Sequence, residues 1–202
     1  MKDWIGNRAS GFAQLGASNH SDVERAENDF YATDPESVKL FLQTLERDNL
    51  TLKHNIWECA CGQGHISKVL EEQGYDVYST DLVDRGYGKS GIDFLKSVPD
   101  SWWGDIVTNP PYKYAKEFVE KGLEVCRTNA YIVMYLKIQF LEGQKRSEMF
   151  KKFPPKYIYV NSIRQTCYIN GDMSKKLQSA TCFCWFIWQK GFSGEPIVRW
   201  II

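Results

Sequence analysis

The sequence has 202 residues, enough chain to bury a core of ordinary size without disulfides or a structural metal. Lysine and arginine together number 25, as do aspartate and glutamate, and this formal net charge of zero excludes a histone-like polycation. A hydrophobic content of 43% with 25% charged residues excludes an intrinsically disordered chain, and no apolar run approaches the roughly 18 residues that span a bilayer.

The predicted elements begin after a polar segment. Residues 1–27 are rich in Gly, Ser and Asn and predict a flexible N-terminal arm, followed by a single domain over residues 28–202. Asp34 and Pro35 are typical of a helix start, and Val38, Phe41, Leu42 and Leu45 then form one apolar stripe. Further helices are predicted over Ile66–Gln73, Tyr114–Cys126 and Gln144–Lys152.

Short apolar strands alternate with these helices, which predicts an α/β fold with a mostly parallel central sheet flanked by helices. The last strand is long and aromatic, and we expect it to be an antiparallel member near the C-terminus. The predicted strands are Asn55–Cys59, Asp76–Thr80, Asp105–Thr108, Ala130–Leu136, Tyr157–Val160 and Thr181–Gln189.

The N-terminus lacks the apolar core of a secretory signal, so we expect a cytoplasmic protein with no membrane partner. Six cysteines are compatible with buried thiols in that compartment. Two pairs have the spacing C-x-C, Cys59/Cys61 and Cys182/Cys184, so a four-thiolate zinc site is an alternative. Because zinc knuckles usually have the spacing C-x-x-C, we favour buried thiols and expect no metal.

A glycine turn follows the first predicted sheet strand. Glu58 ends this strand, Gly62 and Gly64 form the turn, and Asp81 follows the next strand. In open α/β sheets a ligand binds at the carboxyl ends of such strands, and glycines let the backbone approach it closely. The spacing of Asp81 from the glycines suits a carboxylate that holds ribose hydroxyls. The alternative is a tight turn without any ligand.

The composition of this turn favours one kind of ligand. The third glycine of the dinucleotide fingerprint is missing, and Glu58 would repel a pyrophosphate but attract an ammonium group. A ligand that carries both a ribose and an amino acid cation would match both carboxylates, the ribose at Asp81 and the cation at Glu58. The turn therefore indicates S-adenosylmethionine, and an NAD-dependent oxidoreductase is disfavoured.

A second motif, Asn109-Pro110-Pro111-Tyr112, follows the buried strand Asp105–Thr108. Its residues suit methyl transfer to an amino group conjugated with a ring or carbonyl, because two acceptors, the Asn109 side-chain oxygen and the Pro110 carbonyl, can hydrogen-bond the two protons of that nitrogen. Proline has no N–H to compete, and Tyr112 offers a stacking face for a base rotated out of a duplex. The alternative is a stiff loop with a capping Asn.

With both sites in view, the chain from Asn28 onward resembles the class I S-adenosylmethionine-dependent methyltransferases, whose fold is Rossmann-like. More narrowly, it resembles the small phage and prophage adenine-specific DNA methyltransferases that carry an NPPY motif. The resemblance implies that residues 28–202 form one methyltransferase domain and that the catalytic residues are Asn109, Pro110, Pro111 and Tyr112. It implies S-adenosylmethionine-binding roles for Phe30, Tyr31, Thr33, Glu58, Ala60, Gly62, Gly64, Asp81, Leu82, Asp93, Phe94 and Asn109.

The chain departs from that family in two respects. Ala60 stands where many relatives carry glycine or a bulky aromatic residue. Apart from a short insertion around Arg164–Gln178, no separate stretch is left for target recognition, so sequence discrimination is slight or delegated to loops or a partner. Some RNA and protein-glutamine methyltransferases share the NPPY chemistry, so these acceptors stay open beside adenine in DNA. A catalytically silent module that binds cofactor or nucleic acid is a further alternative.

The positive charge of this neutral protein is concentrated in one part of the sequence. Residues 137–176 contain nine basic and three acidic side chains, whereas residues 20–60 contain four basic and nine acidic ones. The segment after the strand Ala130–Leu136 should emerge at the same sheet edge as the NPPY motif, where phosphate contacts would position a nucleic acid. The alternative is a solvated helix face. The candidate nucleic-acid-binding residues are Lys137, Lys145, Arg146 and Arg164.

Overall fold

The computed structural model describes residues 31–96, 101–163, 167–169 and 182–202, with the backbone alone for 167–169. A mixed sheet of seven strands forms its centre, in the order β3-β2-β4-β5-β8-β6-β9. A separate two-stranded ribbon joins β1 (Tyr31–Thr33) to β7 (Cys167–Ile169). The strands of the central sheet are β2 (Asn55–Glu58), β3 (Asp76–Ser79), β4 (Asp105–Thr108), β5 (Tyr131–Lys137), β6 (Tyr157–Asn161), β8 (Phe183–Gln189) and β9 (Ile197–Ile201).

The predicted α/β class and the antiparallel late strand are both confirmed. In the described sheet, β8 runs antiparallel to β5 and to β6, and the other strand pairs are parallel. Parallel neighbours bring the carboxyl ends of β2, β4 and β5 to one edge of the sheet, which is where a ligand binds in open α/β folds.

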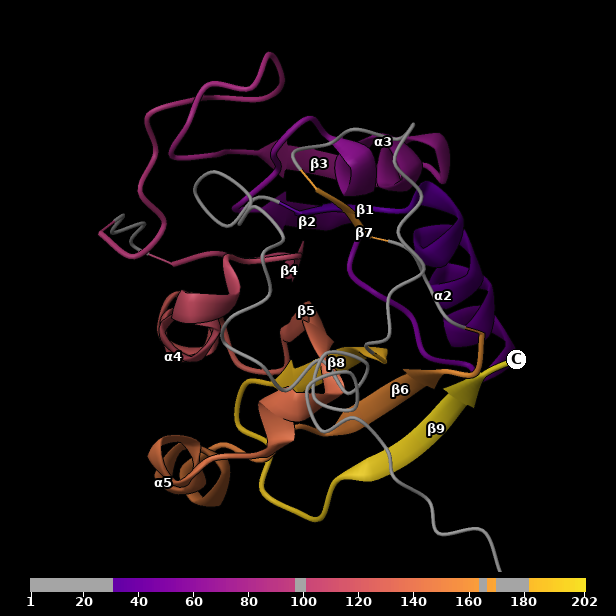
Figure 1. Ribbon diagram of the computed structural model, residues 1–202, viewed down its shortest axis with the longest axis vertical. Helices are drawn as coiled ribbons and strands as arrows, with labels where there is room; N and C mark the ends of the chain where they lie inside the picture. Colours follow the sequence, from indigo (N-terminus) through magenta and orange to yellow (C-terminus); the bar gives the residue numbers. More distant parts are fainter. Residues whose placement is uncertain (1–30, 97–100, 164–166, 170–181) are drawn as a thin grey trace, which may run out of the picture.

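Helices cover both faces of the sheet (Figure 1). The helices α2 (Pro35–Arg47) and α3 (His65–Glu72) lie on one face, and α4 (Ala115–Val125) and α5 (Gln144–Lys152) lie on the other. Alternate residues of the buried strands supply the two cores, since Ile56 packs toward α2 and α3 while Trp57 packs toward α4. On the α2 face, the Phe41 ring stacks on Trp185 of β8 with centroids 4.4 Å apart.

The local helix signals are reproduced closely. The Asp34 side chain accepts a hydrogen bond from the Glu36 N–H at 3.0 Å, and Pro35 occupies the first turn of α2. The helix predicted from Ile66 begins one residue earlier, at His65. The helix predicted from Tyr114 begins at Ala115, after a short 3₁₀ turn over Tyr112–Tyr114, named η2. A second such turn, η3 (Ile138–Leu141), follows β5.

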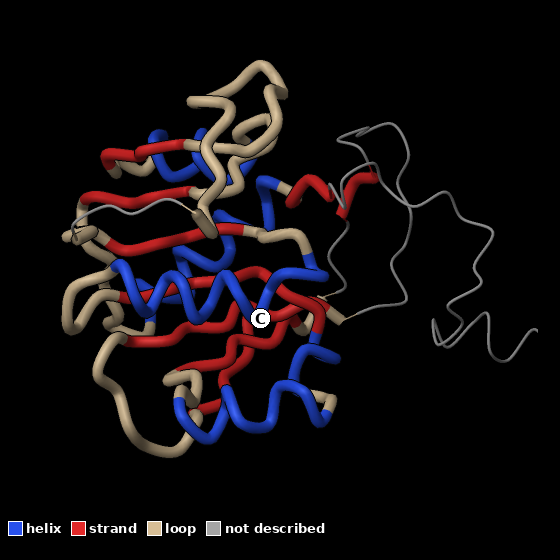
Figure 2. The backbone as a smooth tube through the Cα atoms, turned by 90° about the vertical axis from the view of Figure 1, so that its left-hand side faces the viewer, coloured by secondary structure: helices blue, strands red, loops and turns tan. Residues whose placement is uncertain are grey.

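Two features were not predicted from the sequence. The strand β9 extends the sheet beyond β6, and Arg199 on β9 donates to the Asp48 carboxylate at the end of α2 at 2.8 Å. The ribbon of β1 and β7 lies beyond one end of the central strands (Figure 2), and it uses part of the segment interpreted above as an insertion. The predicted N-terminal arm, and residue Thr181 of the last predicted strand, lie outside the described residues.

Over the described ranges, none of the helices is long and apolar enough to cross a membrane.

Candidate active site

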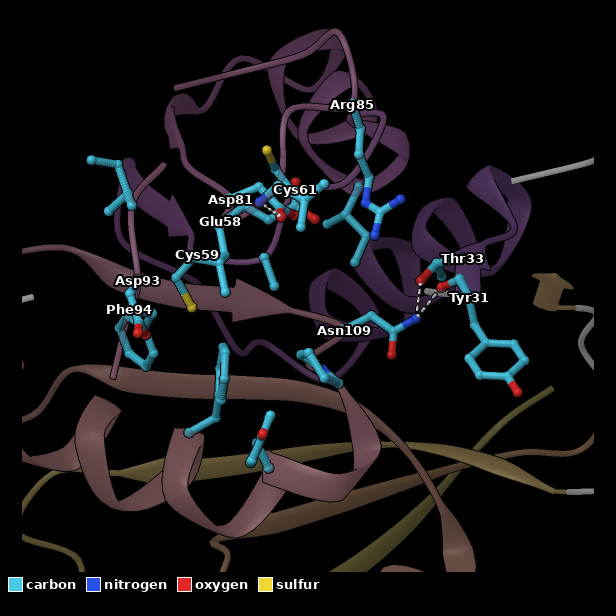
Figure 3. A pocket seen from close by; sticks show the side chains of 18 of the residues that line it. Tyr31, Thr33, Glu58, Cys59, Cys61, Asp81, Arg85, Asp93, Phe94 and Asn109 are labelled. Atoms are coloured by element: carbon cyan, nitrogen blue, oxygen red, sulfur yellow. Dashed lines mark hydrogen bonds between the residues drawn. The ribbon is translucent and has the colours of Figure 1, made fainter. Parts of the chain in front are cut away.

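A pocket opens at the carboxyl ends of β2 and β4 and encloses about 990 Å³, its open mouth included (Figure 3). Four segments far apart in the sequence line it: β1, the end of β2 with the turn that follows, the loop after β3, and the segment after β4. Predicted site residues that line the pocket are Tyr31, Thr33, Glu58, Ala60, Asp81, Leu82, Asp93, Phe94, Asn109 and Pro111. Phe30 lies outside the described residues.

The side-chain amide of Asn109 has a defined orientation. Its Nδ2 donates to the Tyr31 carbonyl at 2.8 Å and to Thr33 Oγ1 at 3.0 Å, which ties the end of β4 to β1. A backbone carbonyl can only accept, so the atom beside it must be the amide nitrogen. The Asn109 Oδ1 atom is therefore the free end of the amide, and it is buried without a hydrogen-bond partner among the described residues. A buried unpaired acceptor costs roughly 1–3 kcal/mol, which a donor on a ligand would recover.

The ring of Tyr112 lies among aromatic and cationic side chains instead of lining the pocket. It stacks on Tyr31 with ring centroids 5.6 Å apart and an interplanar angle of 25°. The centroid of the Phe183 ring lies 6.2 Å from that of Tyr112. Lys137 Nζ lies 5.0 Å from the centroid of the Tyr112 ring and 5.9 Å from that of Tyr31. These contacts join the Tyr112 ring to β1, to β8 and to the end of β5. Tyr31 is half-buried on a three-residue strand, whereas Phe183 is buried in the central sheet.

Glu58 is buried at the end of β2, with only 2% of its surface exposed. Its Oε2 accepts hydrogen bonds from the backbone N–H of Ser67, at 2.8 Å, and from the Ser67 hydroxyl, which also contacts Ser79 Oγ at 2.7 Å. Burial raises the pKa of Glu58 to about 8, although the Ser67 hydrogen bonds oppose the shift. This raised pKa favours the protonated carboxyl at neutral pH.

Asp81 holds the glycine turn from the end of the neighbouring strand. One carboxylate oxygen accepts from the Gly62 N–H at 2.8 Å, and the other accepts from the Val83 N–H at 2.9 Å. Gly62 and Gly64 do not line the pocket, but both have positive φ angles, 55° and 78°. A Cβ on Gly64 would lie 2.5 Å from the Tyr87 ring, so glycine is required there for packing as well as for backbone conformation.

The far side of the pocket is formed by the loop that contains Asp93 and Phe94. Phe94 is buried against Trp57, with ring centroids 5.1 Å apart. The Asp93 carboxylate pairs with Lys96 at 3.0 Å and accepts from the Leu95 N–H at 3.1 Å. Leu82 also lines the pocket, and the residue is 62% exposed.

Of the four candidate nucleic-acid-binding residues, Lys137 emerges beside the NPPY motif as expected, through its contact with Tyr112. The Arg146 guanidinium donates to the carbonyls of Gln139 and Glu142 and lies over the Phe140 ring, so it also closes the turn ahead of α5. Arg164 and the side chain of Lys145 lie outside the described part of the chain.

The structure adds pocket residues that the sequence analysis did not identify. Arg85, His65, Cys59 and Tyr114 also line it. Arg85 follows Asp81 in an irregular loop, where neither periodicity nor a motif distinguishes it from a solvent-exposed arginine. Within the described ranges, no group of three or more His, Cys, Asp or Glu side chains could hold a metal ion, and burial raises the pKa of the Cys61 thiol to about 12. The zinc alternative gains no support from these residues.

Comparisons with known proteins bear on the fold. No protein-family model and no curated protein matches the sequence. A Listeria monocytogenes protein assigned to the class I S-adenosylmethionine-dependent methyltransferases shares the fold with a TM-score of 0.57 at 14% identity, over 95% of this chain and 70% of its own. A Pyrococcus horikoshii protein assigned as an RNA methyltransferase gives 0.58 at 13% identity, over 93% of this chain and 100% of its own.

A third similar structure is the methyltransferase subunit of a type I restriction-modification system from Streptococcus thermophilus. Its TM-score is 0.59 at 12% identity, over 84% of this chain, which spans 47% of that subunit. The chain therefore has the Rossmann-like fold of the class I S-adenosylmethionine-dependent methyltransferases. At such identities the likeness defines the fold, and the function has to be argued from the site.

Proposed function

We propose that this protein is an S-adenosylmethionine-dependent methyltransferase that acts on the exocyclic amino group of adenine in DNA. The observation that carries the proposal is the oriented amide of Asn109. Its nitrogen is held by Tyr31 and Thr33, and its buried oxygen has no partner among the described residues. An acceptor aimed in this way suits a ligand that brings an N–H group to the end of β4.

The lining of the pocket fits the proposed cofactor. The ribose hydroxyls would donate to Asp81, the adenine amino group would donate to Asp93, and the adenine ring would lie against Phe94. Glu58 would pair with the ammonium group at the end of β2. The cofactor would supply an electrophilic methyl group when bound. The carboxylates thus correspond to the hydrogen-bond donors and the cation of a single ligand.

The residues of the NPPY motif would act on the acceptor nitrogen. A conjugated amino group is a poor nucleophile because its lone pair is delocalised into the ring. Hydrogen bonds from its two protons to Asn109 Oδ1 and to the Pro110 carbonyl would favour a pyramidal nitrogen with a localised lone pair. This needs positioning and preoriented dipoles rather than a nucleophilic side chain.

Two observations favour a nucleic-acid base as the acceptor. Lys137 lies over the rings of Tyr31 and Tyr112 beside the pocket, where a cation could contact the phosphate of an extruded nucleotide. Tyr31 and Tyr112 stack on each other at the same place, and a flipped base that displaced Tyr31 would stack on Tyr112, an interaction worth roughly 1–3 kcal/mol. The similar folds include the methyltransferase subunit of a type I restriction-modification system and the modification subunit of a type I restriction enzyme.

The test is transfer of a radiolabelled methyl group to pools of DNA, RNA and peptides in parallel, followed by nucleoside and amino acid analysis of the product. The proposal predicts label in DNA, recovered as N6-methyladenine. Label confined to RNA or to glutamine would keep the chemistry and replace the acceptor. Absence of transfer from a preparation that binds S-adenosylmethionine would indicate a silent module, and tight binding of NAD alone would overturn the proposal.

A further inference from the structure

Arg85 is a cationic pocket residue without a role in the proposed reaction. It belongs to the loop between β3 and β4 and is half-buried. In Figure 3 its side chain points from this loop into the pocket, toward the side where Thr33 and Asn109 lie. An arginine half-buried in a pocket has lost part of its hydration, so an anionic ligand group would be stabilised there.

The other cations of the described lining are less suited to bind an anion. His65 is partly desolvated and lies near Lys68, and both effects lower its pKa, which disfavours the charged imidazolium. Lys113 is exposed, and its Nζ lies 4.7 Å from the centroid of the Tyr114 ring. Arg85 is therefore the described pocket residue with a permanent charge and a half-buried position.

The position of Arg85 relative to two other residues limits which part of the cofactor it can meet. Under the proposed function, the methyl group must reach Asn109, and the ammonium group must reach Glu58. The amino acid portion of the cofactor would then lie between these two residues, and its remaining charged group is a carboxylate. A guanidinium binds a carboxylate through two parallel N–H···O hydrogen bonds.

We propose that Arg85 binds the α-carboxylate of S-adenosylmethionine, an inference that rests on the proposed function. Arg85 and Glu58 then form a pair of opposite charges that matches the zwitterion of the amino acid portion. Such a pair favours the intact cofactor over adenosyl compounds that lack the carboxylate, because these compounds cannot form the two parallel hydrogen bonds with the guanidinium.

Calorimetric titration of the full chain with two ligands tests this inference. S-adenosylmethionine has the carboxylate, whereas decarboxylated S-adenosylmethionine keeps the sulfonium, the ammonium group and the adenosine. Arg85→Gln should weaken binding of the first ligand by about 10- to 100-fold, as expected for a lost charge-assisted pair. The same change should alter binding of the second ligand by less than about threefold.

Two further variants make the comparison specific. Lys89→Gln removes one positive charge from the same loop, but Lys89 is exposed, does not line the pocket and lies over the Tyr78 ring at 5.0 Å. It should leave both affinities unchanged. Arg85→Lys keeps the charge without the planar fork and should give an intermediate loss for S-adenosylmethionine alone.

The outcomes separate this inference from the proposed function. Suppose that the wild-type protein binds both ligands. If Arg85→Gln then weakens binding of both ligands equally, or leaves both affinities unchanged, the carboxylate assignment is wrong while the cofactor assignment stands. If the wild-type protein binds neither ligand, the proposed function itself fails. Thermal unfolding of each ligand-free variant shows whether a uniform loss reflects a folding defect.

Discussion

The most informative perturbation of the pocket is Glu58→Gln. Glu58 is buried, and burial raises its pKa to about 8 from an ordinary value of 4.5. Glutamine has nearly the same shape as the protonated carboxyl and can still accept the Ser67 hydrogen bonds through its carbonyl oxygen. The change therefore removes the titration while preserving the packing.

The sign of the effect on stability follows from the raised pKa. Between pH 4.5 and about 8 the folded protein holds a proton that the unfolded chain has released. The stabilisation of the folded state by this proton is therefore complete below pH 4.5 and declines as pH rises toward 8. The full effect is about 5 kcal/mol, or roughly 1.4 kcal/mol per pH unit within that window. As the pH rises from 6 to 8, the unfolding free energy of wild type should therefore fall by about 2–3 kcal/mol relative to that of Glu58→Gln.

The same proton should appear in ligand binding. At pH 7 a carboxyl with a pKa of about 8 is roughly nine-tenths protonated, so pairing with the cofactor's ammonium group should release nearly one proton. Titration calorimetry in buffers of different ionisation enthalpy measures this release directly. Wild type should release the proton, whereas Glu58→Gln should release none and bind more weakly. Equal proton release by the two proteins, or a parallel pH dependence of their stabilities, would refute the assignment.

Three other predictions concern the turn, the glycines and the basic edge. Asp81→Asn should weaken S-adenosylmethionine binding at least tenfold but not binding of an analogue without ribose hydroxyls, measured by calorimetry; equal losses would mean that Asp81 only holds the turn. Gly64→Ala should lower the unfolding free energy in urea by about 1–3 kcal/mol more than Gly74→Ala, because both have positive φ but only Gly64 meets Tyr87. Lys137→Gln should reduce the slope of log DNA affinity against log salt by about one unit without changing cofactor affinity, and an unchanged slope would exclude a phosphate contact.

Much of the fold could be predicted because its signals are local. Asp34 and Pro35 mark the start of α2 within a few residues, and the alternation of buried strands with amphipathic helices indicates a parallel sheet. The strand β9 was missed because its five residues, apolar apart from Arg199, do not alternate with the period of two that marks a half-buried strand. In the structure Ile197, Val198 and Trp200 are exposed. The contact of β9 with α2 joins Arg199 to Asp48, 151 residues apart, which no local pattern reveals.

In the candidate site, too, local patterns predict some features, whereas others depend on long-range contacts. That Glu58, Asp81 and Asn109 line one pocket could be predicted because each lies at the end of a strand or soon after it, and the carboxyl ends of parallel strands meet at one edge. The orientation of Asn109 could not be predicted, since it depends on Tyr31 and Thr33, 78 and 76 residues earlier in the chain. The stacking of Tyr31 on Tyr112 is a long-range contact of the same kind.

The central claim is that the oriented oxygen of Asn109 accepts a hydrogen bond from the nitrogen that is methylated. The most direct test is the single-turnover rate of methyl transfer to DNA by wild type and by Asn109→Ala, with cofactor affinity measured on the same preparations. We expect N6-methyladenine from the wild-type protein, a rate at least about 100-fold lower in the variant, and cofactor affinities within about threefold of each other. A variant that binds the cofactor and methylates DNA at the wild-type rate would contradict the claim.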